Sequence, residues 1–269
     1  MLTTIADAVT AAVTTAISSW PWYDWAIAGY LGITGIANFG MMVSQPETVP
    51  WSKFAVGYKF KTPCPAKLGM LMKYAGAFSF SAYAVLHPGP ILMPALMLAH
   101  FGKRILEVLC VHSFTGSPTE EASICGIIMS FYTMVAWLYV RAGQATPTAA
   151  AAPSPFWLSM FALAQLGNLY HHMLLRRLRG EGKAGSDAKG GYAVPRGGLF
   201  EYVACPHYLC EIASWGAAAA LAPSAHTALV TFWVAAMLSG RSIATTRWYR
   251  DRFGDKYPMT RRHLIPGVF

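Results

Sequence analysis

The chain has 269 residues, of which 55% are hydrophobic and only 12% are charged. Soluble globular domains carry about 25% charged residues, so this composition excludes an ordinary soluble domain and predicts an integral membrane protein. The formal net charge is +9. The Lys and Arg residues fall into three blocks between apolar runs, which is typical of membrane topology and not of a nucleic-acid-binding surface.

The N-terminal residues 1–20 contain no Lys or Arg, so we expect an interfacial segment there and not a signal peptide. Residues 21–269 show no repeat and no second domain, and we interpret them as a single membrane-embedded domain. Apolar runs of bilayer-spanning length, about 17–25 residues each, recur through this domain and are separated by turn residues. The expected helices are Trp22–Val43, Leu68–Leu86, Ile91–His112, Ala122–Val140, Pro155–Leu175, Leu199–Leu221 and Ser224–Leu238. The predicted fold class is therefore all-α, an integral membrane bundle of about seven transmembrane helices.

The loops between these helices differ in charge. Lys and Arg concentrate in the first and fifth loops and in the C-terminal tail, whereas the second, fourth and sixth loops contain only Arg141. Because cytoplasmic loops are enriched in Lys and Arg, we expect the N-terminus outside and the C-terminus in the cytoplasm. The same bias holds in the endoplasmic reticulum of a eukaryote and in a bacterial inner membrane, so the localisation is predicted only as multi-pass membrane.

The second expected helix contains Lys73 and Tyr74. Charged side chains are costly inside a span and are functional candidates by default. The small residues 75–77 that follow would let a ligand approach the helix closely. For Lys73 alone, snorkelling to the cytoplasmic rim is an equal alternative.

The third helix contains His100, Lys103, Arg104 and Glu107 in an otherwise apolar run. His100 and Arg104 are four residues apart, as are Lys103 and Glu107, so each pair lies on one helical face. We interpret Lys103 and Glu107 as a structural ion pair and Arg104 as a ligand for an anionic group.

The fifth helix has a polar stripe at spacings of four, four and three: Asn168, His172, Arg176 and Arg179. Arginines at the cytoplasmic rim can bind a phosphate through paired hydrogen bonds. Anchoring of anionic lipid headgroups is the alternative, but it does not account for Asn168 in the middle of the span.

In the sixth helix, His207, Tyr208 and Glu211 follow the helix-breaking Pro206, a group that indicates a site. No metal is expected. The eight histidines are mostly scattered, and the five cysteines contain no CxxC pair. The chain also lacks the GxGxxG pattern of a Rossmann domain, so any nucleotide must bind among the helices.

The segment Gly197–Ile212, which includes Cys205-Pro206-His207-Tyr208, resembles the signature of the steroid 5α-reductase superfamily. The ending, with Arg247-Trp248-Tyr249, Tyr257-Pro258 and Leu264-Ile265-Pro266, is similar too. This superfamily includes steroid 5α-reductases, polyprenol reductases and very-long-chain enoyl-CoA reductases, and plant 5α-reductase-like proteins are the most similar to this chain. The resemblance implies seven transmembrane helices that enclose NADPH in their cytoplasmic half.

Carried over by position, the resemblance implies a cofactor set of Asn168, Arg179, Tyr192, His207, Glu211 and Tyr249. The polar clusters and the ending add His172, Arg176, Tyr208 and Arg247. His172 stands where the family has aspartate, and His207 where steroid reductases have asparagine. His100, Phe101 and Arg104 are the expected substrate contacts.

The chain departs from steroid reductases at the group that polarises the substrate carbonyl. Those enzymes use a Gln-Glu pair in the second span and a Tyr in the third, where this chain has Lys73-Tyr74 and His100-Phe101. These segments look more like enoyl-CoA reductases and plant 5α-reductase-like proteins. We expect Tyr74 to be the catalytic oxyanion donor, assisted by Lys73, because a cation beside a phenol favours its charged form.

The expected function is NADPH-dependent reduction of a C=C bond conjugated to a carbonyl, with hydride added to the β-carbon and a proton to the α-carbon. The expected partners are the lipid bilayer and a hydrophobic substrate, first a 3-oxo-4-ene steroid-like compound, with a trans-enoyl-CoA or a polyprenal as alternatives. An isoprenylcysteine-type membrane methyltransferase, which carries Arg-His-Pro-x-Tyr near this position, and a non-catalytic scaffold stay open as other classes. The sequence does not specify the oligomeric state.

Overall fold

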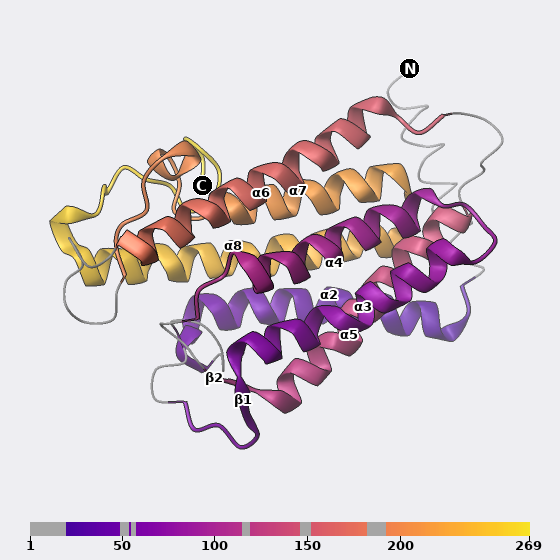
Figure 1. The fold of residues 1–269 in the computed structure, drawn as a ribbon, viewed down its shortest axis with the longest axis horizontal. Helices are drawn as coiled ribbons and strands as arrows, with labels where there is room; N and C mark the ends of the chain where they lie inside the picture. Colours follow the sequence, from indigo (N-terminus) through magenta and orange to yellow (C-terminus); the bar gives the residue numbers. More distant parts are fainter. Residues whose placement is uncertain (1–19, 49–53, 55–57, 115–118, 146–151, 182–191) are drawn as a thin grey trace.

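The computed structural model describes residues 20–48, 54, 58–114, 119–145, 152–181 and 192–269. The expected interfacial segment therefore lies almost entirely outside the described residues. Within them the chain forms an elongated bundle of long helices (Figure 1). These helices are α2 (Trp22–Ser44), α3 (Ala66–Leu86), α4 (Leu92–Cys110), α5 (Ala122–Ala145), α6 (Pro155–Glu181), α7 (Pro206–Leu221) and α8 (Ala225–Phe253). The prediction of an all-α bundle with seven long helices is confirmed, while the orientation of the termini stays a prediction.

Short elements connect the helices. The strands β1 (Pro63–Pro65) and β2 (Thr119–Glu121) pair antiparallel and join the segments that precede α3 and α5. Three 3-10 turns follow α2, precede α7 and follow α8, at Pro46–Thr48, Gly198–Glu201 and Gly254–Lys256. The β pairing was not predicted, because its two strands are far apart in the sequence.

Four of the predicted helix boundaries differ from the structure by five residues or more. The ends at Val140 and Leu175 are too early, because α5 continues to Ala145 and α6 to Glu181. The sixth helix does not begin at Leu199, because a 3-10 turn occupies 198–201 and the helix starts with Pro206 at its first position, where proline is well tolerated. The last helix does not end at Leu238 but continues to Phe253, where Gly254 with a φ of 50° terminates it. Helix α8 therefore extends well beyond the apolar run.

Among the residues that the structure describes, three helical segments are apolar and long enough to cross a bilayer by length and composition: Trp22–Ser44, Ala122–Ala145 and Ala225–Lys256. Two others differ for visible reasons. Helix α7 has only 16 residues, and α4 carries Lys103, Arg104 and Glu107. Helix α4 is therefore not uniformly apolar. It still belongs to the bundle, because its polar groups are buried against other helices.

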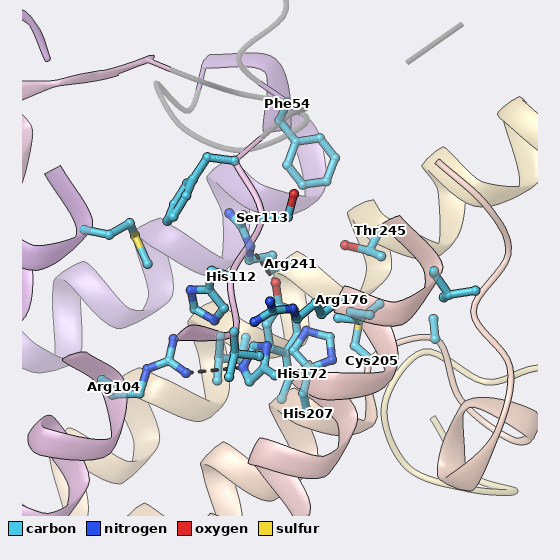
Figure 2. Close-up of a pocket in the computed structure, with 18 of the residues that line it drawn as sticks. Phe54, Arg104, His112, Ser113, His172, Arg176, Cys205, His207, Arg241 and Thr245 are labelled. Carbon is cyan, nitrogen blue, oxygen red and sulfur yellow. Dashed lines mark hydrogen bonds between the residues drawn. The ribbon is translucent and has the colours of Figure 1, made fainter. Parts of the chain in front are cut away.

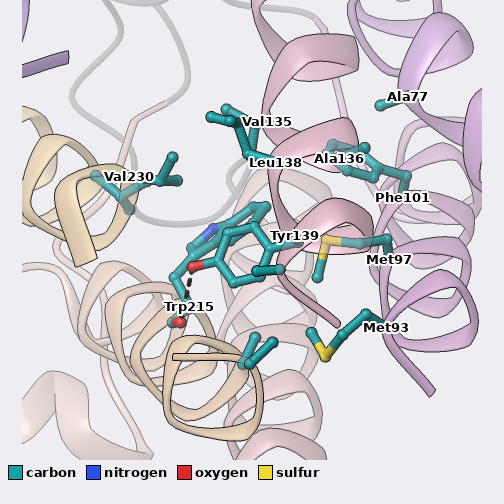
Figure 3. Close-up of a cluster of buried hydrophobic side chains, with 14 of the residues drawn as sticks. Ala77, Met93, Met97, Phe101, Val135, Ala136, Leu138, Tyr139, Trp215 and Val230 are labelled. Atoms are coloured by element: carbon teal, nitrogen blue, oxygen red, sulfur yellow. Dashed lines mark hydrogen bonds between the residues drawn. The ribbon is translucent and has the colours of Figure 1, made fainter. Parts of the chain in front are cut away.

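The helices pack in pairs: α2 lies along α8, α6 lies along α7, and α3 contacts both α4 and α5 (Figure 1). Close contact of α2 with α8 depends on Gly240, where an added Cβ would lie 2.9 Å from the carbonyl oxygen of Phe39. The core between the helices is aromatic and methionine-rich, with Met93 and Met97 facing Tyr139 (Figure 3). The Tyr139 hydroxyl donates to the Trp215 carbonyl at 3.1 Å and so is satisfied.

A polar cluster joins α2, α5 and α8 at the end of the bundle away from the C-terminal tail. Asp24 is 1% exposed, and its Oδ2 accepts a hydrogen bond from Arg141 Nη2 at 2.7 Å. His226 Nε2 lies 3.1 Å from the Asp24 carbonyl oxygen. Arg141, the lone basic residue of the even-numbered loops, thus forms an ion pair within the bundle.

Candidate active site

Two adjoining cavities lie between α3, α4, α5, α6, α7 and α8. The larger has a volume of about 370 Å³ and the smaller about 130 Å³. Tyr74, Arg104, His172 and Tyr208 line both, so these side chains stand at the junction of the two chambers. The larger volume falls within the range of about 300–1,000 Å³ that is usual for ligand sites.

The structure gathers most of the predicted site residues around these chambers. Those that line the larger cavity are Lys73, Tyr74, Arg104, His172, Arg176, Tyr192, His207, Tyr208 and Tyr249. The smaller cavity adds His100, Phe101, Asn168 and Glu211. Residues from four separate sequence clusters thus lie at one place in the fold.

Two predicted residues are not placed there. Arg247 lines neither cavity, and its Nη1 donates to the Val43 carbonyl oxygen at 2.7 Å, at the end of α2. This contact ties α8 to α2. Arg179 lies on α6, but its side chain is outside the described part of the chain.

Tyr74 is held by a cation from the neighbouring helix. Arg104 Nη2 donates to the Tyr74 hydroxyl oxygen at 3.0 Å, and the guanidinium lies 5.3 Å from the ring centroid. On its other side the Tyr74 ring stacks in parallel on Tyr132, with 5.7 Å between the ring centroids. Because Arg104 occupies a lone pair of the phenol oxygen, the hydroxyl hydrogen stays available to a ligand.

Lys73 makes a different contact from the one expected. Its Nζ lies 2.7 Å from Glu120 Oε2, in a pair whose side chains are 6% and 7% exposed. Glu120 belongs to β2, so this ion pair attaches the short β pairing to α3. The cation beside Tyr74 is therefore Arg104, and Lys73 is engaged with a carboxylate.

Three histidines form one wall of the larger cavity (Figure 2). The ring centroids of His112 and His172 are 5.0 Å apart, and those of His172 and His207 are 5.1 Å apart. Arg104 Nη1 lies 3.2 Å from His172 Nε2 and, since arginine only donates, this nitrogen is the acceptor. In the sequence, His112 is one of the scattered histidines.

Glu107, His112 and His172 lie close enough to hold a metal ion, with ligand atoms within 4.8 Å of one another. The same carboxylate, however, forms ion pairs with both Lys103 and Arg104. Two cations at that distance would repel a divalent ion. The donor set therefore fits an internal ion-pair network better than a metal centre.

The smaller cavity ends in a hydrogen-bonded polar group. His100 Nε2 lies 3.5 Å from Glu211 Oε1, and His100 Nδ1 lies 2.8 Å from Gln165 Nε2. Trp215 Nε1 donates to Glu211 Oε1 at 3.2 Å. The remainder of this chamber is lined mainly by apolar and aromatic side chains from α4, α5 and α8.

Sequence reasoning missed Arg241 as a site residue. It is 9% exposed, lines the larger cavity, and its Nε donates to the Tyr208 hydroxyl oxygen at 2.7 Å. In the sequence, Arg241 falls within the basic C-terminal tail. The spacing of four between Met237, Arg241, Thr245 and Tyr249 would have revealed a continuing helical face.

The C-terminal tail holds the segment that enters α7. Arg261 is 2% exposed, and its guanidinium donates to the Pro195 carbonyl at 2.7 Å and to Glu201 Oε2 at 3.3 Å. Burial lowers the pKa of Arg261 below its usual value. The Gly197 amide, which donates to Glu201, lowers the pKa of that carboxyl.

Backbone hydrogen bonds continue this contact between the tail and the segment before α7. The Ala204 amide donates to the Arg262 carbonyl at 2.9 Å, and the Arg262 amide donates to the Tyr202 carbonyl at 3.0 Å. Phe200, Ala204 and Cys205 of the same segment line the larger cavity. The last residues of the chain therefore fix part of the cavity wall.

Comparison with known proteins shows the family of this chain. The family model for 3-oxo-5-alpha-steroid 4-dehydrogenase matches residues 123–269, and the chain belongs to this family. With its apolar helices, this identifies an integral membrane protein and confirms the resemblance to the superfamily.

Curated relatives fall into the same group. The chain is 33% identical over 189 residues to a 3-oxo-5-alpha-steroid 4-dehydrogenase 1 of Macaca fascicularis, covering 68% of this chain and 67% of that protein. It is 32% identical over 178 residues to a very-long-chain enoyl-CoA reductase of Dictyostelium discoideum, covering 62% and 54%. The steroid 5-alpha-reductase DET2 of Solanum lycopersicum is 31% identical over 133 residues, covering 49% of this chain and 44% of that protein.

Proposed function

We propose that this protein is an NADPH-dependent reductase of a C=C bond conjugated to the carbonyl of a lipid substrate. The observation that carries the proposal is the position of Tyr74, held by Arg104 where a cation-rich cavity meets an aromatic one. Within the family found above, such a junction suits a reaction between a bound dinucleotide and an apolar molecule.

The donor set of the larger cavity fits a phosphate-bearing cofactor. Among the described lining residues, Lys73, Arg104, Arg176 and Arg241 are cationic, and Glu120 alone is acidic. Guanidinium groups match phosphate oxygens with paired, charge-assisted hydrogen bonds. When bound, NADPH supplies the hydride. Arg176 and Arg241 are the residues that we expect to hold its phosphates, with the predicted cofactor contacts His207 and Tyr249 on the same cavity wall.

Tyr74 would act on the substrate carbonyl. Hydride addition to the β-carbon breaks the C=C π bond and places negative charge on the carbonyl oxygen, and a proton then adds to the α-carbon. The Tyr74 hydroxyl donates its hydrogen to that oxygen, while Arg104 stabilises the charge that shifts onto the phenol. In this proposal Arg104 has the role first expected of Lys73, and Lys73 positions the β2 segment through Glu120.

The smaller cavity would hold the apolar body of the substrate. Phe101, Tyr132, Trp215 and Trp233 surround it with flat apolar surfaces, which suit the rings of a steroid-like enone and equally the chain of an unsaturated acyl group. The names of the relatives include both steroid and enoyl-CoA reductases. We propose a 3-oxo-4-ene steroid-like substrate first, with a trans-enoyl-CoA or a polyprenal as the alternatives within the same chemistry.

We propose the membrane orientation from the position of the cavity. The larger chamber is lined by Tyr192 and Tyr249, next to the basic extension of α8. Helix α8 ends beside the C-terminal tail (Figure 1). A cytoplasmic cofactor therefore reaches it when the C-terminus is cytoplasmic and the N-terminus is outside, within a single membrane-embedded domain over residues 21–269.

The experiment is NADPH oxidation by the purified protein in detergent, with a 3-oxo-4-ene steroid, a polyprenal and a long-chain trans-enoyl-CoA. Tyr74→Phe should lower kcat by about a hundredfold or more, as expected for loss of an oxyanion donor. Tyr139→Phe is the matched control, because it removes an equally buried hydroxyl from the core outside both cavities. Full turnover by Tyr74→Phe would reject this residue as the acid. Binding of S-adenosylmethionine without binding of NADPH would support the methyltransferase alternative.

A further inference from the structure

A chain of buried polar contacts connects the cofactor side of the bundle to Tyr74. It runs from the first turn of α7 through Asn168 on α6 to Lys103, Glu107 and Arg104 on α4, and ends at the Tyr74 hydroxyl on α3. Lys103 and Glu107 line neither cavity. We propose that these two residues are positioning residues that set the Tyr74–Arg104 pair against the cofactor wall. This inference rests on the proposed role of Tyr74.

Glu107 is the centre of the chain. It is 1% exposed, and its two oxygens take different cations: Oε1 lies 3.0 Å from Lys103 Nζ, and Oε2 accepts from Arg104 Nη1. A carboxylate in such a place would be destabilising without these partners. Its burial and double pairing fix both cations on the same helical face.

The contact with Glu107 determines where Arg104 points. A guanidinium is planar and presents its donors in a rigid fork. With Nη1 held by Glu107 and His172, Nη2 is directed at the Tyr74 hydroxyl oxygen at 3.0 Å. A loss of the Glu107 carboxylate therefore frees the whole fork, although Glu107 itself touches neither Tyr74 nor a cavity.

Lys103 connects this group to the opposite wall. Its Nζ donates to Asn168 Oδ1, and Asn168 Nδ2 donates to the His207 carbonyl oxygen at 2.8 Å. His207 lines the larger cavity at the start of α7. The position of the proposed cofactor wall is thus coupled to the position of Tyr74 through hydrogen bonds and not only through apolar packing.

The test is Glu107→Gln, measured for kcat, for the KM of NADPH and for NADPH affinity in the absence of substrate. A displacement of about 1 Å in a catalytic group can cost about a hundredfold in rate. We expect kcat to fall about ten- to a hundredfold, while NADPH affinity changes less than about threefold because Glu107 lines neither cavity. Glu107→Asp, which keeps the charge, should restore part of kcat.

The decisive readout is a double-mutant cycle with Tyr74→Phe. If Glu107 acts through Tyr74, adding Glu107→Gln to Tyr74→Phe should lower kcat less than about twofold further. Independent, multiplicative losses would overturn the proposal, as would full kcat in Glu107→Gln. Full activity in Tyr74→Phe alone would instead overturn the proposed role of Tyr74, so the two failures differ.

A second variant covers misfolding. Lys103→Gln/Glu107→Gln removes one cation and one anion, so the net charge of the trio with Arg104 is unchanged and no unpaired buried carboxylate is left. If Glu107→Gln is not recovered as a monodisperse species, this double variant takes its place in the cycle. It should also lose kcat and retain NADPH affinity, and a normal kcat would overturn the proposal.

Discussion

Replacement of Arg261 tests whether the C-terminal tail holds the cavity wall. Arg261→Met keeps an apolar stem of similar length but removes the guanidinium, which leaves the Pro195 carbonyl without its donor. Glu201 keeps its bond to the Gly197 amide at 2.6 Å. We expect the segment 195–205 to separate from the tail more often, while the helices stay folded.

The magnitude follows from three contacts. The charge-assisted bond to Pro195, at 2.7 Å, contributes about 1.5–3 kcal/mol. The bond to Glu201 contributes less than about 1 kcal/mol, because that carboxylate is 42% exposed and screened by solvent. The guanidinium also lies 5.7 Å from the Tyr257 ring centroid, a contact of about 0.5–1 kcal/mol. The sum is about 3 kcal/mol, which corresponds to about a hundredfold change in the local opening equilibrium.

Hydrogen exchange of the full protein in detergent measures this opening directly. The amides of Ala204 and Arg262, which bond across the tail contact, should lose about a hundredfold of their protection in Arg261→Met. Amides within α3 and α5 should keep theirs. Arg261→Lys, which retains the charge but not the fork, should lie between the two. Unchanged protection in Arg261→Met would refute the reasoning, as would an equal loss throughout the bundle.

Other predictions concern pH, the distant ion pair and helix packing. The pKa of Glu201 is lowered from its ordinary value of 4.5. The contribution of its carboxylate to the stability of the tail contact is therefore complete above pH 4.5 and is lost as the pH falls through the lowered pKa. Exchange protection at the tail should fall in acid, and Glu201→Gln should remove this dependence. Asp24→Asn should lower the free energy of unfolding by about 1–2 kcal/mol and leave kcat unchanged. The loss is smaller than for a fully buried ion pair, because the Arg141 side chain is 38% exposed. Gly143→Ala should lower the free energy of unfolding, measured by thermal unfolding, by about 1–3 kcal/mol, because the added Cβ would lie 2.5 Å from a methionine side chain. Gly29→Ala is the control and should be neutral, because an added Cβ there has nothing within 4 Å.

Most of the bundle could be predicted from the sequence, because bilayer length and helix period are local properties. The runs that became α2, α3 and α4 begin and end within about two residues of expectation. The largest boundary errors lie where an apolar run and the helix do not cover the same residues. The start at Leu199 failed because an apolar segment forms a 3-10 turn, and the end at Leu238 failed because α8 continues with charged residues on its surface.

Contacts between distant segments could not be predicted in this way. The β1–β2 pairing joins loops on either side of two helices, and the Lys73–Glu120 ion pair joins α3 to β2. Spacing rules describe neighbours on one helix and give no information on such pairs. The Lys103–Glu107 pair, in contrast, was predicted from a spacing of four and is present at 3.0 Å.

The cation beside Tyr74 shows how far local geometry can be used. Successive residues of a helix point about 100° apart, so a lysine directly before a tyrosine is poorly placed to contact its hydroxyl. The partner had to come from another helix, and the four-residue spacing of His100 and Arg104 already placed two polar side chains on one face of the third span. The structure turns that face toward the cavities, with Arg104 at the Tyr74 hydroxyl and His100 at Glu211.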